Sequence, residues 1–273
     1  MNKNILFVLF CFLCFSSNAQ DIPSLTSEQN EIKDLVWNKW DTKNFIILSL
    51  DYDKGIYLKN NIEKIKDSIF EKWNFRNIDF SSECKIICVK NKELLNKLFK
   101  IEKPRMEVRI DKEGKISLSA LWFYLEDNSD FPKDKLAEIC ISYLEQDSNK
   151  QMPLYLKKGI CLLSEDAEEI KNNLSNDNIL NVDINNLLKT NNEIFDKFSE
   201  EEREKFTNQS SSLVLLFRNE YGADNLHDYI NRNNLDSFGI KNIDELNKII
   251  NRYNGHLLED LKKEKVPIDY LKK

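Results

Sequence analysis

Hydrophobic and polar positions divide the chain into a first half with strands and a largely helical second half. Short apolar runs bounded by polar residues predict strands, and the last two form a hairpin around Gly114. These strands cover 44–50, 84–90, 106–111 and 116–125. Apolar residues that recur at the helical period predict helices in the same half of the chain. These helices cover 26–41, 56–74 and 92–100.

The segment after the first strand, 51–55, contains two carboxylates and a glycine. Such a set can belong to a calcium-binding loop, but the other ligands of that loop are missing here. The sequence therefore predicts a plain turn at 51–55.

From residue 131 onward the pattern is largely helical. Phe131 and Pro132 lead into the first helix, and an Asn- and Asp-rich surface excursion is expected at 172–192. A charged helix start is expected at 199–206, followed by an apolar helix at 210–221 that ends at Gly222. Further helices are expected at 225–231 and 243–253, and a short one at 257–263. The sequence predicts an α+β fold in which a small mixed β-sheet with helices is followed by a mainly helical C-terminal half, joined across a groove. We expect parts 20–130 and 131–273 to form one compact domain.

Composition fits a globular protein and excludes some partners. The chain has 273 residues, 41% of them hydrophobic, which is enough for a sizeable core. The net charge is −6, and lysine and arginine are spread along the chain without a basic block. We therefore expect no nucleic-acid partner.

Residues 1–19 have the pattern of a secretory signal peptide. Lys3 supplies the basic start, 5–15 is an unbroken apolar run, and 17–19 approximates the small-x-small cleavage pattern before Gln20. The run is too short for a stable membrane span, and no second segment is apolar and long enough. We expect an exported protein with no integral membrane span in its mature chain. An uncleaved N-terminal anchor is the less favoured alternative.

The most informative window is 136–163. Leu136, Ala137, Cys140, Ile141 and Leu144 form an apolar arc on a predicted helix, with polar residues opposite. A loop and a second apolar segment follow. A plain amphipathic helix, loop and helix would account for this window without any functional site.

The spacing in this window resembles the active site of the gluzincin metallopeptidases, in their peptidase-MA-like, thermolysin-type branch. That family has H-E-x-x-H on one helix, followed about a dozen residues later by P-x-W-L-x-E-G, whose Glu is the third zinc ligand. The resemblance places the two His positions on Ala137 and Ile141, the Glu between them on Glu138, the ligand Glu on Lys158, and the Pro, Trp, Leu and Gly positions on Pro153, Tyr155, Leu156 and Gly159.

Later segments follow the same family order. A helix that ends in Tyr-Gly is followed by a short Leu-containing helix and then by a G-x-x-L-x-x-L segment. These parts are 214–222, 226–230 and 255–261, and the resemblance covers most of 40–265.

The resemblance implies a gluzincin fold that has lost its zinc. A catalytic zinc takes three protein ligands and an open position for water. Ala137 and Ile141 offer no donor atom, and Lys158 brings a positive charge to a cation site. Without the ion, water keeps a pKa far above neutral, so Glu138 alone cannot generate hydroxide at neutral pH. We expect no cofactor, no metal and a vestigial Glu138. In the resembled geometry Glu138 and Lys158 face one vacated cavity, so we predict that they form an ion pair linking the two helices. In the alternative, Lys158 points to solvent.

In the resembled family the last strand before the active-site helix is a sheet edge that receives an extended substrate. Here that strand carries Leu121, Trp122, Phe123 and Tyr124, an apolar set that can bind a peptide by strand addition. The favoured alternative is that half of these side chains face the core and the others are covered.

Other candidate chemistry is weak. Removing the two signal-peptide cysteines from the total of six leaves Cys84, Cys88, Cys140 and Cys161. On one strand Cys84 and Cys88 lie about 13 Å apart, too far for a disulfide. The resembled fold permits a bridge between Cys140 and Cys161, but buried thiols are favoured. The two histidines, His227 and His256, lie in predicted C-terminal helices, the latter at a helix start, and surface or cap roles are favoured for both.

The favoured function is an exported, metal-free pseudo-peptidase that binds a protein or peptide in or near the former groove. Two alternatives remain: an active hydrolase with a rearranged site, and a structural envelope protein. The sequence does not name the partner or the substrate.

Overall fold

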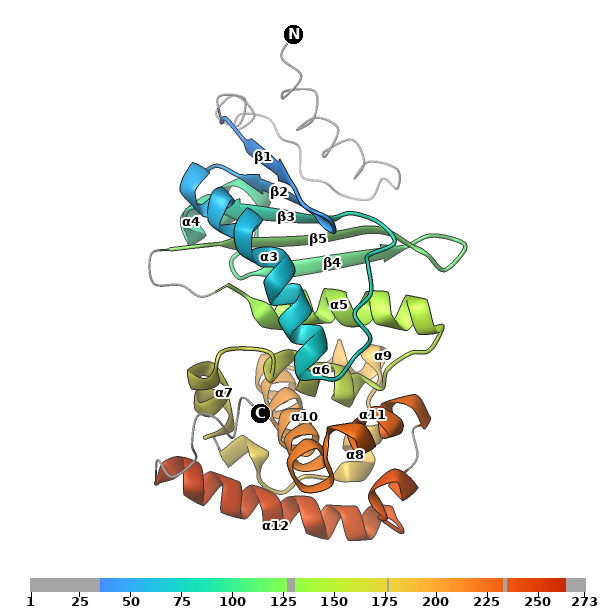
Figure 1. Ribbon diagram of the computed structural model, residues 1–273. Coiled ribbons are helices and arrows are strands. Elements are labelled where there is room, and N and C mark those ends of the chain that lie inside the picture. Colours follow the sequence, from blue (N-terminus) through green and yellow to red (C-terminus); the bar gives the residue numbers. More distant parts are fainter. Residues whose placement is uncertain (1–34, 127–130, 176, 233–234, 264–273) are drawn as a thin grey trace.

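The computed structural model describes residues 35–126, 131–175, 177–232 and 235–263. The predicted signal peptide lies outside these residues. The described part has the predicted α+β fold, with a mixed sheet and helices in its first half and a mainly helical second half (Figure 1). No helix among these residues is long and apolar enough to cross a membrane.

Five strands form the sheet. They are β1 (Asn38–Asp41), β2 (Phe45–Ser49), β3 (Cys84–Val89), β4 (Arg105–Ile110) and β5 (Ile116–Tyr124). Their order is β1-β2-β3-β5-β4, with β2, β3 and β5 parallel to one another and the outer strands β1 and β4 antiparallel to their neighbours. The buried β3 lies at the centre, so its near-continuous apolar sequence fits a strand covered on both faces.

Helices make up most of the remaining described chain. They are α3 (Tyr52–Lys72), α4 (Lys92–Phe99), α5 (Lys133–Ser148), α6 (Leu154–Leu162), α7 (Ala167–Leu174), α8 (Ile184–Lys189), α9 (Asn192–Phe195), α10 (Glu200–Tyr221), α11 (Ala223–Arg232) and α12 (Ile243–Lys262), with short 3₁₀ segments at Asp177–Ile179 and Leu235–Phe238. Ser199 begins α10 with a capping box, in which its hydroxyl accepts from the Glu202 N–H while the Glu202 carboxylate accepts from the Ser199 N–H.

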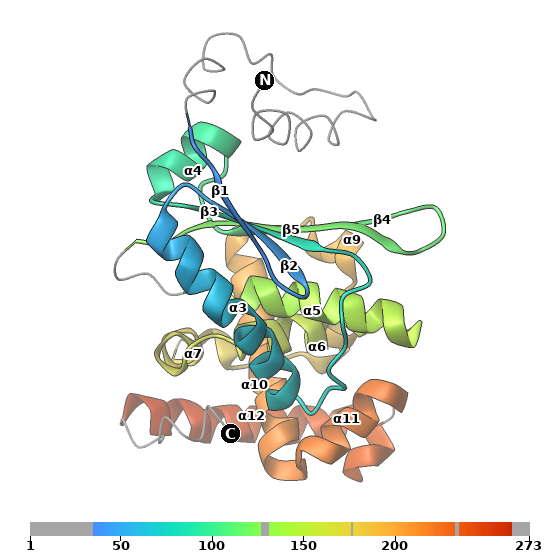
Figure 2. The same cartoon turned by 45° about the horizontal axis from the view of Figure 1, so that its top comes forward.

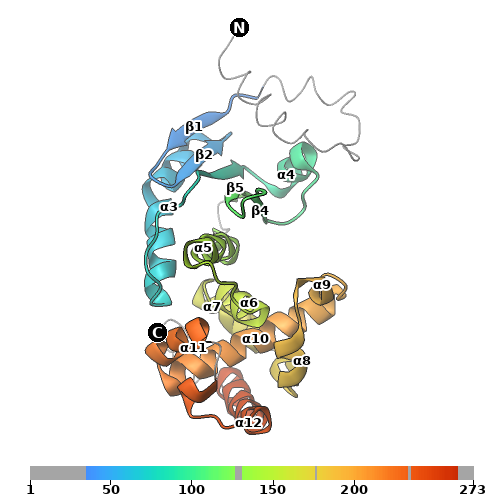
Figure 3. The ribbon, with the colours of Figure 1, turned by 90° about the vertical axis from the view of Figure 1, so that its right-hand side faces the viewer.

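The two faces of the sheet pack against different helices. Leu121 and Phe123 of β5 join the main core with α3 and α5, whereas Trp122 joins a smaller core with α4 on the other face. The alternation follows from the two-residue period of a strand. Figure 2 and Figure 3 show α3 and α5 on one side of the sheet and α4 on the other.

Helix α3 also ties the sheet to the helical half. The Trp73 indole at its end donates to the Ser164 hydroxyl at 3.1 Å, and Asn74 donates to Asp224 at 3.2 Å. The Arg218 guanidinium of α10 lies over the Trp73 ring, 5.1 Å from its centroid. These contacts fix the sheet relative to α10 and α11.

The prediction of a helix at 26–41 is wrong for residues 35–41, the part of this segment that the structure describes. Asn38–Asp41 is instead a strand that pairs antiparallel with β2. The Trp40 ring packs where a Cβ on Gly55 would lie, and Val36, expected on the apolar side, is exposed. Pairing with β2 and packing on α3 therefore override the helical spacing of the apolar residues.

The predicted turn at 51–55 is also wrong, because this segment starts α3. Asp51 is its N-cap, and its carboxylate accepts from the Lys54 N–H at 3.1 Å. An aspartate is as typical of a helix N-cap as of a turn, so local residue type alone cannot separate the two structures.

The Asn-rich segment 172–192 is not a surface excursion. It forms the end of α7, a 3₁₀ turn and α8, and it buries Ile179, Val182, Ile184 and Leu187. Side-chain amides of α12 satisfy its backbone: Asn251 accepts from the Val182 N–H and Asn247 from the Ile184 N–H, each at 2.9 Å. The Asn and Asp side chains of the segment stay largely exposed, whereas its apolar side chains are buried and its buried backbone groups bond to α12.

Two expected helix breaks do not occur. The charged 199–206 and the apolar 210–221 belong to one helix, α10, which ends before Gly222 as predicted. Residues 243–253 and 257–263 fall in α12, which continues through Gly255, so His256 lies inside a helix rather than at its start. A single glycine weakens a helix by only about 1 kcal/mol, which packing offsets.

Candidate functional site

The candidate site lies where α5 meets α6. Ala137 and Ile141, at the positions of the resembled histidines, are fully buried on the core side of α5. Glu138 and Glu145 lie on the other side of this helix, with partly exposed side chains. The apolar arc predicted for this segment is therefore its packing face, and the carboxylates point toward α6.

Helix α6 begins after Pro153, which has no N–H to leave unpaired at a helix start. Tyr155 is buried, and its hydroxyl shares a hydrogen bond with the Tyr229 hydroxyl of α11. A Cβ on Gly159 would lie 2.7 Å from the Ser210 carbonyl oxygen and 2.7 Å from Val214 Cγ2 of α10. Gly159 therefore permits the close approach of α6 and α10.

The predicted ion pair between Glu138 and Lys158 is confirmed. Lys158 Nζ donates to Glu138 Oε1 at 2.9 Å, and the two side chains are 21% and 15% exposed. The Lys158 ammonium also lies 5.2 Å from the centroid of the Phe195 ring, a cation–π distance. Lys158 thus links α5, α6 and α9.

A second ion pair, which sequence reasoning missed, repeats the link between α5 and α6 two turns further along α5. Lys157 Nζ donates to Glu145 Oε2 at 2.8 Å, and Glu145 Oε1 accepts from the Met152 N–H at 2.8 Å. Glu138 and Glu145 are seven residues apart, two turns of helix, so they share a face of α5. That spacing, beside adjacent lysines on α6, was a signal in the sequence.

These residues do not fit a zinc ion. The side chains of Ala137 and Ile141 contain only carbon and hydrogen and cannot bind a metal. The carboxylate of Glu138 is paired with the Lys158 ammonium. Within the described residues, no group of three or more His, Cys, Asp or Glu side chains is placed to hold a metal. The arrangement can form polar contacts with a ligand, but it lacks a donor set for Lewis-acid catalysis.

The cysteines and histidines add no reactive centre to this site. Cys84, Cys88, Cys140 and Cys161 are all buried and free, as favoured from the sequence. Burial raises the pKa of Cys84 and that of Cys88 to about 12, so both thiols stay protonated at neutral pH. His256 is exposed on α12, and His227 lies in α11.

The expectation that 121–124 forms a sheet edge is wrong. Strand β5 lies between β3 and β4, and Leu121, Trp122 and Phe123 are buried. The favoured alternative is confirmed: half of these side chains face the main core, and the others are covered on the α4 face of the sheet. The edge next to β5 is β4, whose ends are exposed and whose centre is half-buried.

A buried carboxyl group caps the start of α5. Pro132 provides no side-chain cap, and Glu165 Oε1 accepts from the Asp134 N–H at 2.7 Å. Burial, together with the neighbouring Asp134 carboxylate, raises the pKa of Glu165 to about 9. Glu165 is therefore protonated at neutral pH.

Because of the raised pKa of Glu165, we expect the stability of the fold to decrease as the pH rises. A pKa raised from 4.5 to about 9 by folding favours the fold fully below about 4.5, and the contribution disappears as the pH climbs through about 9. We expect the free energy of unfolding to drop by about 2.7 kcal/mol between pH 6 and pH 8, measured by urea unfolding. Glu165→Gln keeps a neutral hydrogen-bonding group and should remove most of this dependence. An unchanged dependence in the variant would contradict the assignment.

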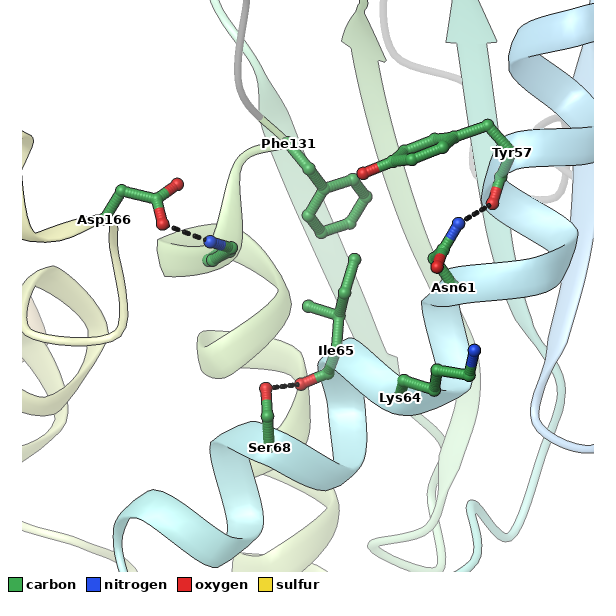
Figure 4. Close-up of a pocket in the computed structure, with 8 residues that line it drawn as sticks. Tyr57, Asn61, Lys64, Ile65, Ser68, Phe131 and Asp166 are labelled. Carbon is green, nitrogen blue, oxygen red and sulfur yellow. Dashed lines mark hydrogen bonds and ion pairs between the residues drawn. The ribbon is translucent and has the colours of Figure 1, made fainter. Parts of the chain in front are cut away.

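The structure also has a surface pocket of about 300 Å³ beside α3. Figure 4 shows the Tyr57 ring extending from α3 toward Phe131, with the Lys133–Asp166 ion pair on the opposite wall. None of the residues at the resembled zinc-site positions lines this pocket. Its mixed lysine, aspartate and aromatic lining favours no single class of ligand.

Comparison with models of protein families and with curated proteins finds no match to this chain. Conclusions about its function therefore depend on its own residues and their geometry.

Proposed function

We propose that this protein is an exported, metal-free relative of the gluzincins that binds a peptide, or an extended segment of a protein, in or near the former active-site groove. One observation carries the proposal. The Glu138–Lys158 pair joins α5 to α6 at the two motif positions where the resembled proteins have a catalytic Glu and a zinc-ligand Glu. The pair supports a loss of the metal with retention of the surrounding scaffold.

Strand β4 is the binding edge that we favour, in place of the predicted β5. Among the described residues β4 pairs on one side only, with β5, and it lies against α5. An edge strand presents unpaired N–H and C=O groups to which an extended chain can add. Met106 and Val108 of this strand pack toward the main core, so alternate side chains of a peptide paired with β4 would point to the α5 side of the sheet.

A screen of immobilised peptides against the mature chain, residues 20–273, tests this proposal. Binding by strand addition should tolerate many side chains and should be lost when alternate peptide nitrogens of the ligand are methylated, because methylation removes the N–H donors. Retained affinity after methylation would contradict strand addition.

Proline variants on β4 locate the binding edge. In an antiparallel pair, neighbouring residues alternate between N–H groups that face the partner strand and N–H groups that face away. Of Glu107→Pro and Val108→Pro, one should lose a bond to β5 and melt at a lower temperature. The other should stay folded and lose peptide binding by at least about 10-fold, since proline is tolerated at a free edge. Full binding by both folded variants would exclude β4.

The alternatives give different results in the same experiments. A hydrolase with a rearranged site would cleave peptides from the screen, and cleavage would be lost on Glu138→Gln. A structural envelope protein would bind no peptide in any variant. Either result would replace the proposal.

A further inference from the structure

Residues 191–199, which we call the strap, run beside the Glu138–Lys158 pair. The strap contains α9 and connects α8 to α10, and Figure 3 shows it next to α6. None of its residues is buried, and only Phe195 and Phe198 are half-buried. The chain is buried at Thr190, directly before the strap, and again at Phe206, within α10 after it.

Phe195 connects the strap to the pair. The Lys158 ammonium lies 5.2 Å from the Phe195 ring centroid while it donates to Glu138, so the ring and the carboxylate both cover this ammonium. The Arg203 guanidinium lies 5.7 Å from the centroid of the same ring. Edge-on contacts of Phe195 and Phe198 with Phe206 hold the strap against α10.

The remaining contacts of the strap are local or exposed. Asn191 caps α9 within the strap, and Arg203 donates to the Asp196 carbonyl at 2.6 Å. Next to the strap, Glu200 pairs with Lys103 before β4 at 2.8 Å, but these side chains are 86% and 79% exposed. Segments with few buried apolar contacts open locally at a small fraction of the cost of global unfolding.

We propose that the strap is a gate over the Glu138–Lys158 pair, with Phe195 as its closing residue, and that it must move before a peptide can reach this pair. The proposal rests on the proposed function, because it assigns the regulation of that same site. An opening of this kind reduces the apparent affinity of a ligand by the fraction of molecules that are open. Removing the Phe195 ring should therefore raise peptide affinity.

Acylation of lysines on the folded mature chain tests the gate without a peptide. N-hydroxysuccinimidyl acetate is the probe, and mass spectrometry gives the rate at each lysine. Lys157 is the internal control, since it is the adjacent residue on α6, similarly buried and similarly paired with a glutamate. We expect Phe195→Ala to raise the Lys158 rate about 3–10-fold and to leave the Lys157 rate unchanged. Ile194→Ala is the matched variant, because Ile194 is 41% exposed on the same short helix and should change neither rate.

Hydrogen exchange of the wild-type chain tests whether the strap moves. Amides of 191–199 should exchange at least about 100-fold faster than those of 213–217, the buried centre of α10. Equal protection of the two segments, or a Lys158 acylation rate that does not change in Phe195→Ala, would overturn the gate.

Higher accessibility of Lys158 without higher affinity for peptides found in the screen would overturn the control of peptide binding by the gate. Failure of every variant to bind a peptide, with acylation and exchange as expected, would instead overturn the proposed function.

Discussion

Replacing Gly159 with alanine is expected to lower the free energy of unfolding by about 2–3 kcal/mol, because overpacking a rigid contact costs this much. The added Cβ would meet the Ser210 carbonyl oxygen and Val214 Cγ2, each at 2.7 Å. A backbone oxygen cannot rotate away as a flexible side chain can, so α6 and α10 must separate. Urea unfolding of the mature chain measures the loss.

Gly255→Ala is the matched control. Gly255 also lies inside a helix, but nothing lies within 4 Å of a Cβ built on it. Alanine favours a helix over glycine by up to about 1 kcal/mol, so this variant should be as stable as the wild type or more stable. Opposite signs for the two substitutions are expected. A Gly159→Ala variant with unchanged stability would contradict the close helix contact.

Replacing Lys158 with methionine is expected to lower the free energy of unfolding by about 2–3 kcal/mol. The substitution leaves the Glu138 carboxylate, only 15% exposed, without its ammonium partner. Breaking a fully buried pair costs ~3–5 kcal/mol, and the remaining exposure to water reduces that loss. Thermal and urea unfolding at pH 7 measure it.

The double variant Glu138→Gln/Lys158→Met should recover most of this stability, because neither member of the pair then remains as a lone charge. Lys262→Met is the control on a surface pair. Lys262 and Asp177 lie 2.9 Å apart but are 55% and 72% exposed, so the loss should stay below about 0.5 kcal/mol. A loss at Lys158 no larger than that at Lys262 would show that the Glu138–Lys158 pair is a solvated surface contact.

Strands and helices with strong local patterns were predictable from the sequence. The apolar runs of β2 and β3 fit strands that are buried on both faces, and the helical period of α3 fits a helix with one buried face. Two features could not be predicted from local sequence patterns. The strand β1 exists because it pairs with β2, and the apolar residues of 172–192 can be buried because asparagines from a distant helix satisfy the backbone beside them.

The candidate site shows the same division. The motif spacing predicted that Glu138 and Lys158 would meet, and they do. The cover of that pair by Phe195 was not predictable, because 37 positions separate Lys158 from Phe195 and no local pattern links α9 to α6. The position of β5 was wrong for a related reason: strand order depends on pairing between distant segments, and β4 takes the edge by folding back along β5.

Metal content of residues 20–273, purified without chelators, tests the central claim most directly. We predict no stoichiometric zinc by elemental analysis and a melting temperature that does not change when a chelator is added, because a lysine ammonium stands where the resembled proteins have a zinc ligand. About one equivalent of zinc, lost together with stability on Glu138→Ala, would contradict the account and place an active metallopeptidase site in this fold.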